Sequence, residues 1–185
     1  MRTGFALLLL LGLALAGCGL AATDTAEMPL DAHGAPVMTQ NEAIGLAAWV
    51  LENPAVAQDK PALAARAVAA TDWLAGQEFL TGGLDTYSPA RVVYWQILRR
   101  EIRTWLGVRP GTTSQEVVDA LFAASAALAR HDDAKARAAL QAPGFSLGAE
   151  RTLATLSHLP RFAGTVRAFT DLMTAPLQME PSSGR

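Results

Sequence analysis

Residues 88–110, SPARVVYWQILRREIRTWLGVRP, contain the clearest helix signal in the chain. Ser88 followed by Pro89 is typical of a helix start, and Gly107 and Pro110 are typical of its end. Between them, large apolar side chains recur at spacings of three and four, which places them on one face of a helix. These side chains are Trp95, Leu98, Ile102, Trp105 and Leu106. The stretch therefore predicts an amphipathic helix whose apolar face is buried.

Three arginines lie on the same predicted helix. Arg99, Arg100 and Arg103 are expected to point away from the apolar stripe, as a solvated face that pairs in part with Glu101 and with acidic residues elsewhere. Contact with an anion or a partner molecule is the alternative interpretation of these three residues.

Charge is distributed unevenly along the chain. Residues 19–88 contain two basic and nine acidic side chains, whereas residues 89–185 contain twelve basic and eight acidic ones. We expect the two parts to pack together through complementary charge. The alternative is a polar molecule that presents a basic face to anionic lipid or to a partner protein.

Helix signals also occur on both sides of this stretch. No segment alternates at period two for long, so the sequence predicts an all-α fold. We expect six or seven short helices in an irregular bundle or an array of helical hairpins. The predicted helix starts are the capping boxes Thr39–Glu42 and Thr113–Glu116, the candidate caps Asp59 and Asp132–Asp133, a start near Ala149, and Pro160 for the last helix. Gly76 and Gly82–Gly83 are candidate stops for the helix that follows Asp59.

Residues 116–140, EVVDALFAASAALARHDDAKARAAL, predict two helices joined by a tight turn. The stretch resembles one hairpin of a tetratricopeptide repeat, but no second copy follows at that period, and such arrays need about three. It is also similar to exported bacterial helical proteins of unknown activity, a resemblance that implies no particular function.

The amino terminus predicts export. Arg2 precedes an uncharged, leucine-rich run over residues 4–17. At about 1.5 Å per residue, this run spans about 21 Å as a helix, short of the roughly 30 Å of bilayer hydrocarbon. A short apolar run behind a positive end is typical of a signal peptide.

Leu15-Ala16-Gly17-Cys18 resembles the lipobox of bacterial lipoprotein precursors. The resemblance implies cleavage between Gly17 and Cys18 and attachment of lipid to Cys18. Gly19 rather than aspartate follows the cysteine, which implies sorting to the outer membrane, facing the periplasm, with the inner membrane as the alternative. Cys18 is the only cysteine. Its lipidation would therefore leave no thiol for disulfides or thiolate chemistry.

Four segments are expected. Residues 1–17 are the signal peptide, 18–38 a lipidated cysteine and flexible tether, 39–174 an all-α domain, and 175–185 a disordered tail.

Motifs for catalysis are weak. Gly144–Gly148, GFSLG, matches the G-x-S-x-G pattern of serine hydrolases, but that pattern needs a preceding strand and a downstream acid and histidine. Here a helix precedes Ser146, and His158 comes before Asp171. A hydrolase acting through Ser146 is therefore disfavoured, and Ser146 is expected to cap a helix. No catalytic residue, metal ligand or cofactor is predicted, because consecutive residues such as 131–133 (HDD) cannot all converge on one ion.

The favoured function is that of a membrane-anchored, non-enzymatic module that binds another envelope component, such as a protein. Nucleic acid is not an expected partner outside the cytoplasm. The alternative is a carrier or sensor of an apolar ligand such as a lipid, held within the bundle. In the favoured interpretation, the tryptophans Trp49, Trp73, Trp95 and Trp105 are core residues; in the alternative, they line a pocket.

Overall fold

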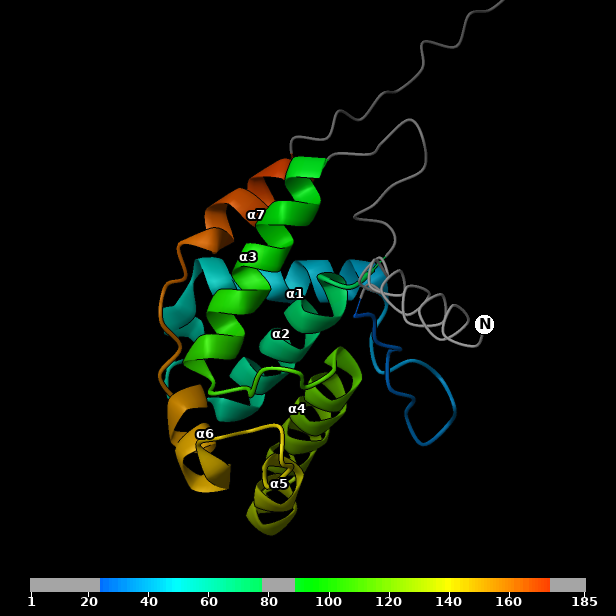
Figure 1. The fold of residues 1–185 in the computed structure, drawn as a ribbon. Helices are drawn as coiled ribbons and strands as arrows, with labels where there is room; N and C mark the ends of the chain where they lie inside the picture. The colour runs from blue at the N-terminus through cyan, green and yellow to red at the C-terminus, as the bar shows by residue number, and fades with distance from the viewer. Residues whose placement is uncertain (1–23, 78–88, 174–185) are drawn as a thin grey trace, which may run out of the picture.

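The computed structural model describes residues 24–77 and 89–173, and in these ranges the protein is all-α, as predicted (Figure 1). Two isolated bridges, Leu30–Pro36 and Val108–Phe145, are the only β pairings within them. The elements are α1 (Gln40–Glu52), the 3₁₀ turn η1 (Pro54–Ala57), α2 (Pro61–Leu74), α3 (Pro89–Trp105), α4 (Ser114–Leu128), α5 (Asp133–Leu140), α6 (Gly148–Leu156) and α7 (Gly164–Met173).

Both predicted capping boxes are confirmed. Thr39 accepts a hydrogen bond from the Glu42 backbone at 3.3 Å, and the Glu42 carboxylate accepts one from the Thr39 backbone at 2.7 Å. Thr113 and Glu116 make the same reciprocal pair at the start of α4. The backbone N–H of the capping threonine is the leading cause that lowers the pKa of each glutamate.

Two predicted helix boundaries are wrong. The residue before α2 is Lys60, without a side-chain cap, because Asp59 has a φ of 55° and its N–H donates to Ser157 instead. The last helix begins at Gly164 rather than Pro160. A Cβ at Gly164 would lie 3.1 Å from the Leu98 Cα, so this helix start lies directly against α3.

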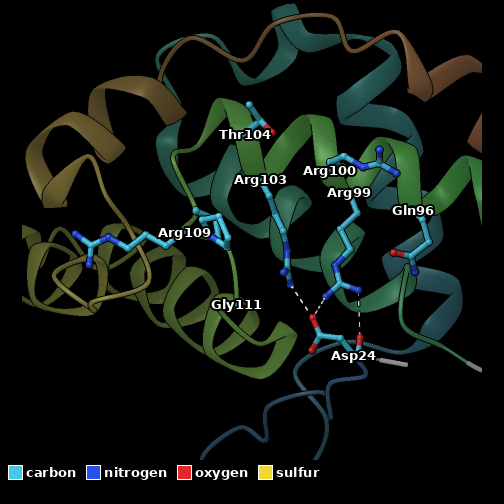
Figure 2. Close-up of a pocket in the computed structure, with 10 residues that line it drawn as sticks. Asp24, Gln96, Arg99, Arg100, Arg103, Thr104, Arg109 and Gly111 are labelled. Carbon is cyan, nitrogen blue, oxygen red and sulfur yellow. Dashed lines mark hydrogen bonds and ion pairs between the residues drawn. The ribbon is translucent and has the colours of Figure 1, made fainter. Parts of the chain in front are cut away.

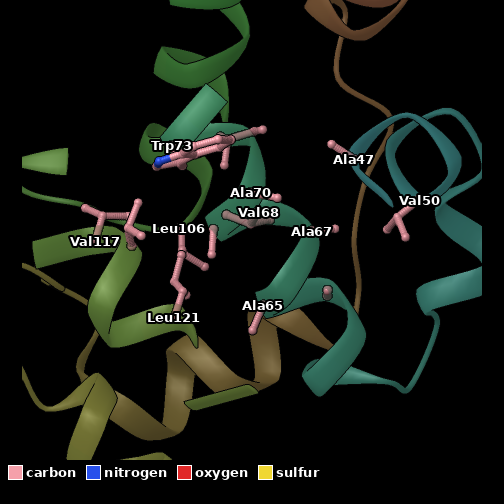
Figure 3. Close-up of a cluster of buried hydrophobic side chains, with 14 of the residues drawn as sticks. Ala47, Val50, Ala65, Ala67, Val68, Ala70, Trp73, Leu106, Val117 and Leu121 are labelled. Carbon is pink, nitrogen blue, oxygen red and sulfur yellow. The ribbon is translucent and has the colours of Figure 1, made fainter. Parts of the chain in front are cut away.

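Helix α2 is the centre of the molecule. It packs against α1, α3, α4 and α6, and its residues from Ala67 to Leu74 are all buried. Figure 3 shows its side chains between Val50 of α1 on one side and Leu106, Val117 and Leu121 on the other. Small alanine side chains let the neighbouring helices approach closely. A helix that is buried all round must be apolar or have its polar groups paired.

The predicted apolar stripe of α3 is confirmed. Trp95, Leu98, Ile102 and Leu106 are at most 2% exposed, and Trp105 is partly buried. Helix α3 packs along α7 (Figure 1). Trp95 meets Phe169 of α7 edge to face, with ring centroids 5.0 Å apart. Of the tryptophans predicted for the core, Trp49 differs: it is 51% exposed.

Residues 24–38 do not form the flexible tether expected for 18–38. Ala26 and Met38 are buried, and Gln77 donates a hydrogen bond to the Ala26 carbonyl. Glu27 exchanges two backbone hydrogen bonds with the side chain of Gln115 in α4. The contacts are made by backbone groups and polar side chains, which leave no helical period in the sequence. The lack of a helical period therefore does not mean that the segment is flexible.

Gly76 ends α2, as one of the two candidate stops predicted, and it also admits the amino-terminal segment. A Cβ there would lie 2.8 Å from the Asp24 carbonyl oxygen, which is too close for any other residue without a shift. The signal peptide 1–17, Cys18, the tail 175–185 and the second candidate stop, Gly82–Gly83, lie outside the described residues. Within the described ranges, no helix has the length and apolar character needed to span a bilayer.

The burial of Ile102 predicts a large loss of stability on truncation. Changing Ile102 to alanine should lower the free energy of unfolding by about 2–5 kcal/mol, because it removes packed methylene groups and leaves a cavity. Thermal or denaturant unfolding of the purified protein measures this. Val93, on the same helix but 53% exposed, is the matched control, and Val93→Ala should change stability by less than about 0.5 kcal/mol. Equal effects of the two substitutions would contradict the assigned burial of α3.

Candidate functional site

A buried ionic network joins three separate parts of the chain. Asp72 of α2 is 2% exposed and lies between two arginines of α3. Arg103 binds its two oxygens through Nε at 2.6 Å and Nη2 at 2.8 Å, and the Nε of Arg99 lies 3.4 Å from Oδ1. Arg99 also pairs with Asp24, from the amino-terminal segment. Two carboxylates thus neutralise two guanidinium groups.

The start of α4 completes the network. The backbone N–H of Ser114 donates to Asp24 Oδ1 at 2.7 Å, and the Ser114 hydroxyl donates to Asp72. A carboxylate at a helix amino terminus is favoured by the unpaired N–H groups and by the helix dipole. Arg103 also donates to the carbonyl oxygen of Thr112, just before α4, at 3.0 Å. The network therefore fixes the amino-terminal segment, α2, α3 and α4 relative to one another.

The pKa of Arg103 is set by two opposing effects, its burial and its carboxylate partners. Burial acts to lower this pKa, because it removes water from the charged form. Hydrogen bonding and charge attraction from Asp72, with a further contribution from Asp24, outweigh burial and raise the pKa above its ordinary value. Arg103 is therefore a permanent cation held by its carboxylate partners.

The expected solvated face of Arg99, Arg100 and Arg103 is wrong for two of its members. Arg99 is 6% and Arg103 18% exposed, and both turn toward Asp24, whereas Arg100 is exposed (Figure 2). The sequence contained a signal for this arrangement. Arg99 lies four residues after Trp95 and three before Ile102, so it continues the buried stripe. The expected complementary packing between the acidic and basic parts of the chain is present, since both carboxylates precede residue 89 and both arginines follow it.

A pocket of about 430 Å³ lies beside the network. Its walls carry Asp24, Arg99 and Arg103 together with two exposed arginines, Arg100 and Arg109. Figure 2 shows that neither Arg100 nor Arg109 points toward Asp24; the Arg109 side chain extends away from the network, and its Nη1 donates to the Pro143 carbonyl. Because Asp24 and Asp72 neutralise Arg99 and Arg103, the pocket walls keep an excess of positive charge.

A second pocket of about 580 Å³ lies along the same helix and shares Arg100 and Thr104 with the first. Its apolar wall includes Trp105 and Phe162, whose rings meet edge to face at 5.5 Å. Another exposed arginine, Arg161, lies at its rim. We call Arg100, Thr104, Arg109 and Arg161 the arginine face. Only Arg100 among them was expected from the sequence, because Arg109 and Arg161 lie on loops that the fold brings beside Arg100 and Thr104 of α3.

The G-x-S-x-G segment has the wrong surroundings for a nucleophile elbow. It follows helix α5 rather than a strand. The Ser146 hydroxyl donates to the Gly107 carbonyl at 2.7 Å, while His158, just after α6, contacts the Ala154 carbonyl of that helix. Ser146 also does not cap α6, whose preceding residue, Leu147, makes no side-chain cap. Its contacts join this loop to the end of α3.

The predicted turn at residues 131–133 is confirmed as a helix start. The Asp132 carboxylate accepts from the Lys135 backbone N–H at 3.1 Å and pairs with the Lys135 ammonium group. These contacts with Lys135 lower the pKa of Asp132. In the part of the chain that the structure describes, no three histidine, cysteine, aspartate or glutamate side chains are grouped as metal ligands.

No known protein family, curated protein or solved structure matches this chain. Its function must therefore be argued from the two pockets, the buried network and the arginine face. Of these, only the arginine face and the pocket mouths are open to a partner, because the groups of the network already bind one another.

Removing the Asp72 charge should destabilise the whole domain. Asp72→Asn keeps the shape of the side chain but leaves Arg99 and Arg103 short of a counter-charge. Breaking a buried ion pair in this way costs about 3–5 kcal/mol. Denaturant unfolding measures the loss. The control is Asp119→Asn on the exposed face of α4, for which we expect a change within about 0.5 kcal/mol. A loss at Asp72 no larger than at Asp119 would mean that the network does not hold the fold.

Proposed function

We propose that this protein is a lipid-anchored protein of the bacterial envelope whose helical domain is a non-enzymatic binding module. Cys18 carries the lipid after cleavage between Gly17 and Cys18, and the domain faces the periplasm at the outer membrane. The support for the anchor is the amino-terminal sequence, LAGC, behind a short apolar run. Several acyl chains on one residue hold a protein stably at a membrane, whereas a single chain holds it only reversibly.

The observation that carries the binding function is the arginine face. Three exposed guanidinium groups lie around two hollows that meet at Arg100 and Thr104. Guanidinium groups bind phosphate and carboxylate through paired hydrogen bonds, so clusters of exposed arginines are typical of surfaces that recognise anions. The partner of this face is therefore a negatively charged component of the envelope.

A non-enzymatic role agrees with the chemistry of the described residues. The Ser146 hydroxyl is bonded to a backbone carbonyl. Asp24 and Asp72, the acidic groups with the most contacts, are already paired with arginines in the network. A nucleophile needs a base within hydrogen-bond reach, and Ser146 has no such partner among the described side chains.

A second candidate, the apolar-ligand carrier, is supported by the pocket at Trp105 and Phe162. Its volume of about 580 Å³ falls within the range of small-molecule sites. The pocket lies between α3 and the segment that leads to α7, rather than within the helical core. A lipid that copurifies with the protein and is lost on Phe162→Ala would favour this candidate over the binding module.

The anchor makes a direct prediction. Cys18→Ser should abolish acylation and leave uncleaved precursor, because only a thiol accepts the thioether-linked lipid. Metabolic labelling with an alkyne fatty acid measures acylation, and gel mobility measures cleavage. Ser125→Ala, with an unaltered Cys18, serves as the labelling control. Label that persists in the Cys18 variant would exclude this residue as the acceptor.

The binding module predicts cross-links from one face only. A photo-reactive side chain at Thr104, within the arginine face, should capture an envelope component in cells, whereas one at the exposed Ala138 of α5 should not. Changing Arg100 and Arg109 together to glutamate should abolish the Thr104 product. Because exposed charges are screened over about 8 Å at physiological ionic strength, added salt should weaken it as well. Equal capture from the two positions would contradict a specific binding face.

A further inference from the structure

We propose that the arginine face binds the anionic phospholipid headgroups of the membrane in which Cys18 anchors the chain, so that this face of the domain lies against the bilayer. This inference rests on the proposed lipid anchor and names the partner of the proposed binding face. It combines two independent observations: the place where the amino-terminal segment is fixed to the domain, and the charge that surrounds that place.

The first observation is the short reach of the anchor. Asp24 lies six residues after Cys18, and six residues span at most about 20 Å whatever their conformation. Asp24 itself cannot move away from the domain without losing Arg99 and the Ser114 backbone N–H. A domain of this size is roughly 40 Å across. The side that carries Asp24 must therefore stay near the bilayer, and the opposite side cannot turn toward it.

The second observation is the charge on the side of the domain that carries Asp24 and that the anchor keeps near the bilayer. Asp24 lies in the wall of the same pocket as Arg100 and Arg109. The negative charge of Asp24 is paired with Arg99 and Arg103. Arg161, in the segment before α7, adds a third exposed cation at the neighbouring pocket, while Glu101 is only partly exposed and accepts a hydrogen bond from the Gly164 backbone at 3.0 Å. Around this pocket the anchored side thus presents net positive charge to the lipid, whereas the exposed carboxylates of Glu27 and Glu116 lie at α4.

The arrangement of the arginines favours a surface over a single small anion. Arg109 extends away from the pocket that it shares with Arg100 (Figure 2), and Arg161 belongs to the other pocket. Cations that diverge cannot enclose one phosphate group, but they can each bind a different headgroup. Val93 and Thr104, exposed on the same stripe of α3 as Arg100, add small uncharged contacts at the level of the headgroups.

The experiment uses the mature lipidated protein reconstituted into vesicles. Lipidation consumes the only native thiol, so Thr104→Cys provides a single site for an environment-sensitive fluorophore. The vesicles contain phosphatidylglycerol with phosphatidylethanolamine, or phosphatidylcholine alone, and a small fraction of lipid with a quencher on its headgroup. Ala138→Cys on α5 is the matched control. Each arginine contributes about a fivefold preference for an anionic surface, so three should favour the docked orientation by roughly a hundredfold.

We expect quenching at position 104 in the phosphatidylglycerol vesicles and little at position 138. Changing Arg100, Arg109 and Arg161 to glutamate should abolish quenching at 104 while the protein still sediments with the vesicles. About 1 M salt should do the same, because it shortens the screening length to roughly 3 Å.

Three results would overturn the proposal in distinguishable ways. Protein that does not sediment with vesicles would refute the lipid anchor, and with it the orientation. Protein that sediments but shows equal quenching at 104 and 138 would refute the docked orientation alone. Quenching at 104 that is the same on phosphatidylcholine, or a cross-link from Thr104 to a protein in place of lipid, would refute anionic lipid as the partner of this face.

Discussion

The carboxylate of Asp72 lies on a helix that is buried along most of its length, and only 2% of this residue is exposed to solvent. A charge in such a place is tolerated only when its lone pairs are occupied and a counter-charge is close. Arg99, Arg103 and Ser114 meet these demands, and meeting them determines where α3 and the start of α4 can lie on α2. Apolar packing alone would allow the helices to slide against each other, since alanine surfaces fit in many registers. The network selects one arrangement.

The network also explains how the uneven charge of the chain is used. The acidic first part contributes Asp24 and Asp72, and the basic second part contributes Arg99 and Arg103, so the four charges cancel inside the fold. The cations that remain at the surface, such as Arg100, Arg109 and Arg161, surround this neutral centre. Helix α3 therefore contributes to the ionic network on one side and presents positive charge to solvent on another. The helical spacing separates these two roles, because Arg99 and Arg100 are neighbours in sequence but point in different directions.

Local signals in the sequence predicted local structure well. The capping boxes at Thr39 and Thr113 and the stripe from Trp95 to Leu106 depend on residues within a few positions of one another, and all are present. Features that join distant residues were missed. Periodicity cannot show that Asp24 meets Arg99, since nothing near either residue encodes the other. The burial of Arg99 could have been inferred from its place in the apolar stripe, but its partners could not. The pocket walls at Arg109 and Arg161 come from loops, whose course depends on the packing of helices on either side.

The attachment of the amino-terminal segment also has a consequence for the order of assembly. Asp24 depends on Arg99 and Ser114, which lie 75 and 90 residues further along the chain. A chain that crosses a membrane with its amino terminus leading delivers Asp24 long before those residues, and the early part must wait for α3 and α4 to follow. If the chain is exported in this way, as we propose, the first described segment to emerge is among the last to reach its folded position. The proposed lipid acceptor, Cys18, would then have no folded domain beside it when the modifying enzymes act, and closure of the ionic network would mark the end of both transport and folding.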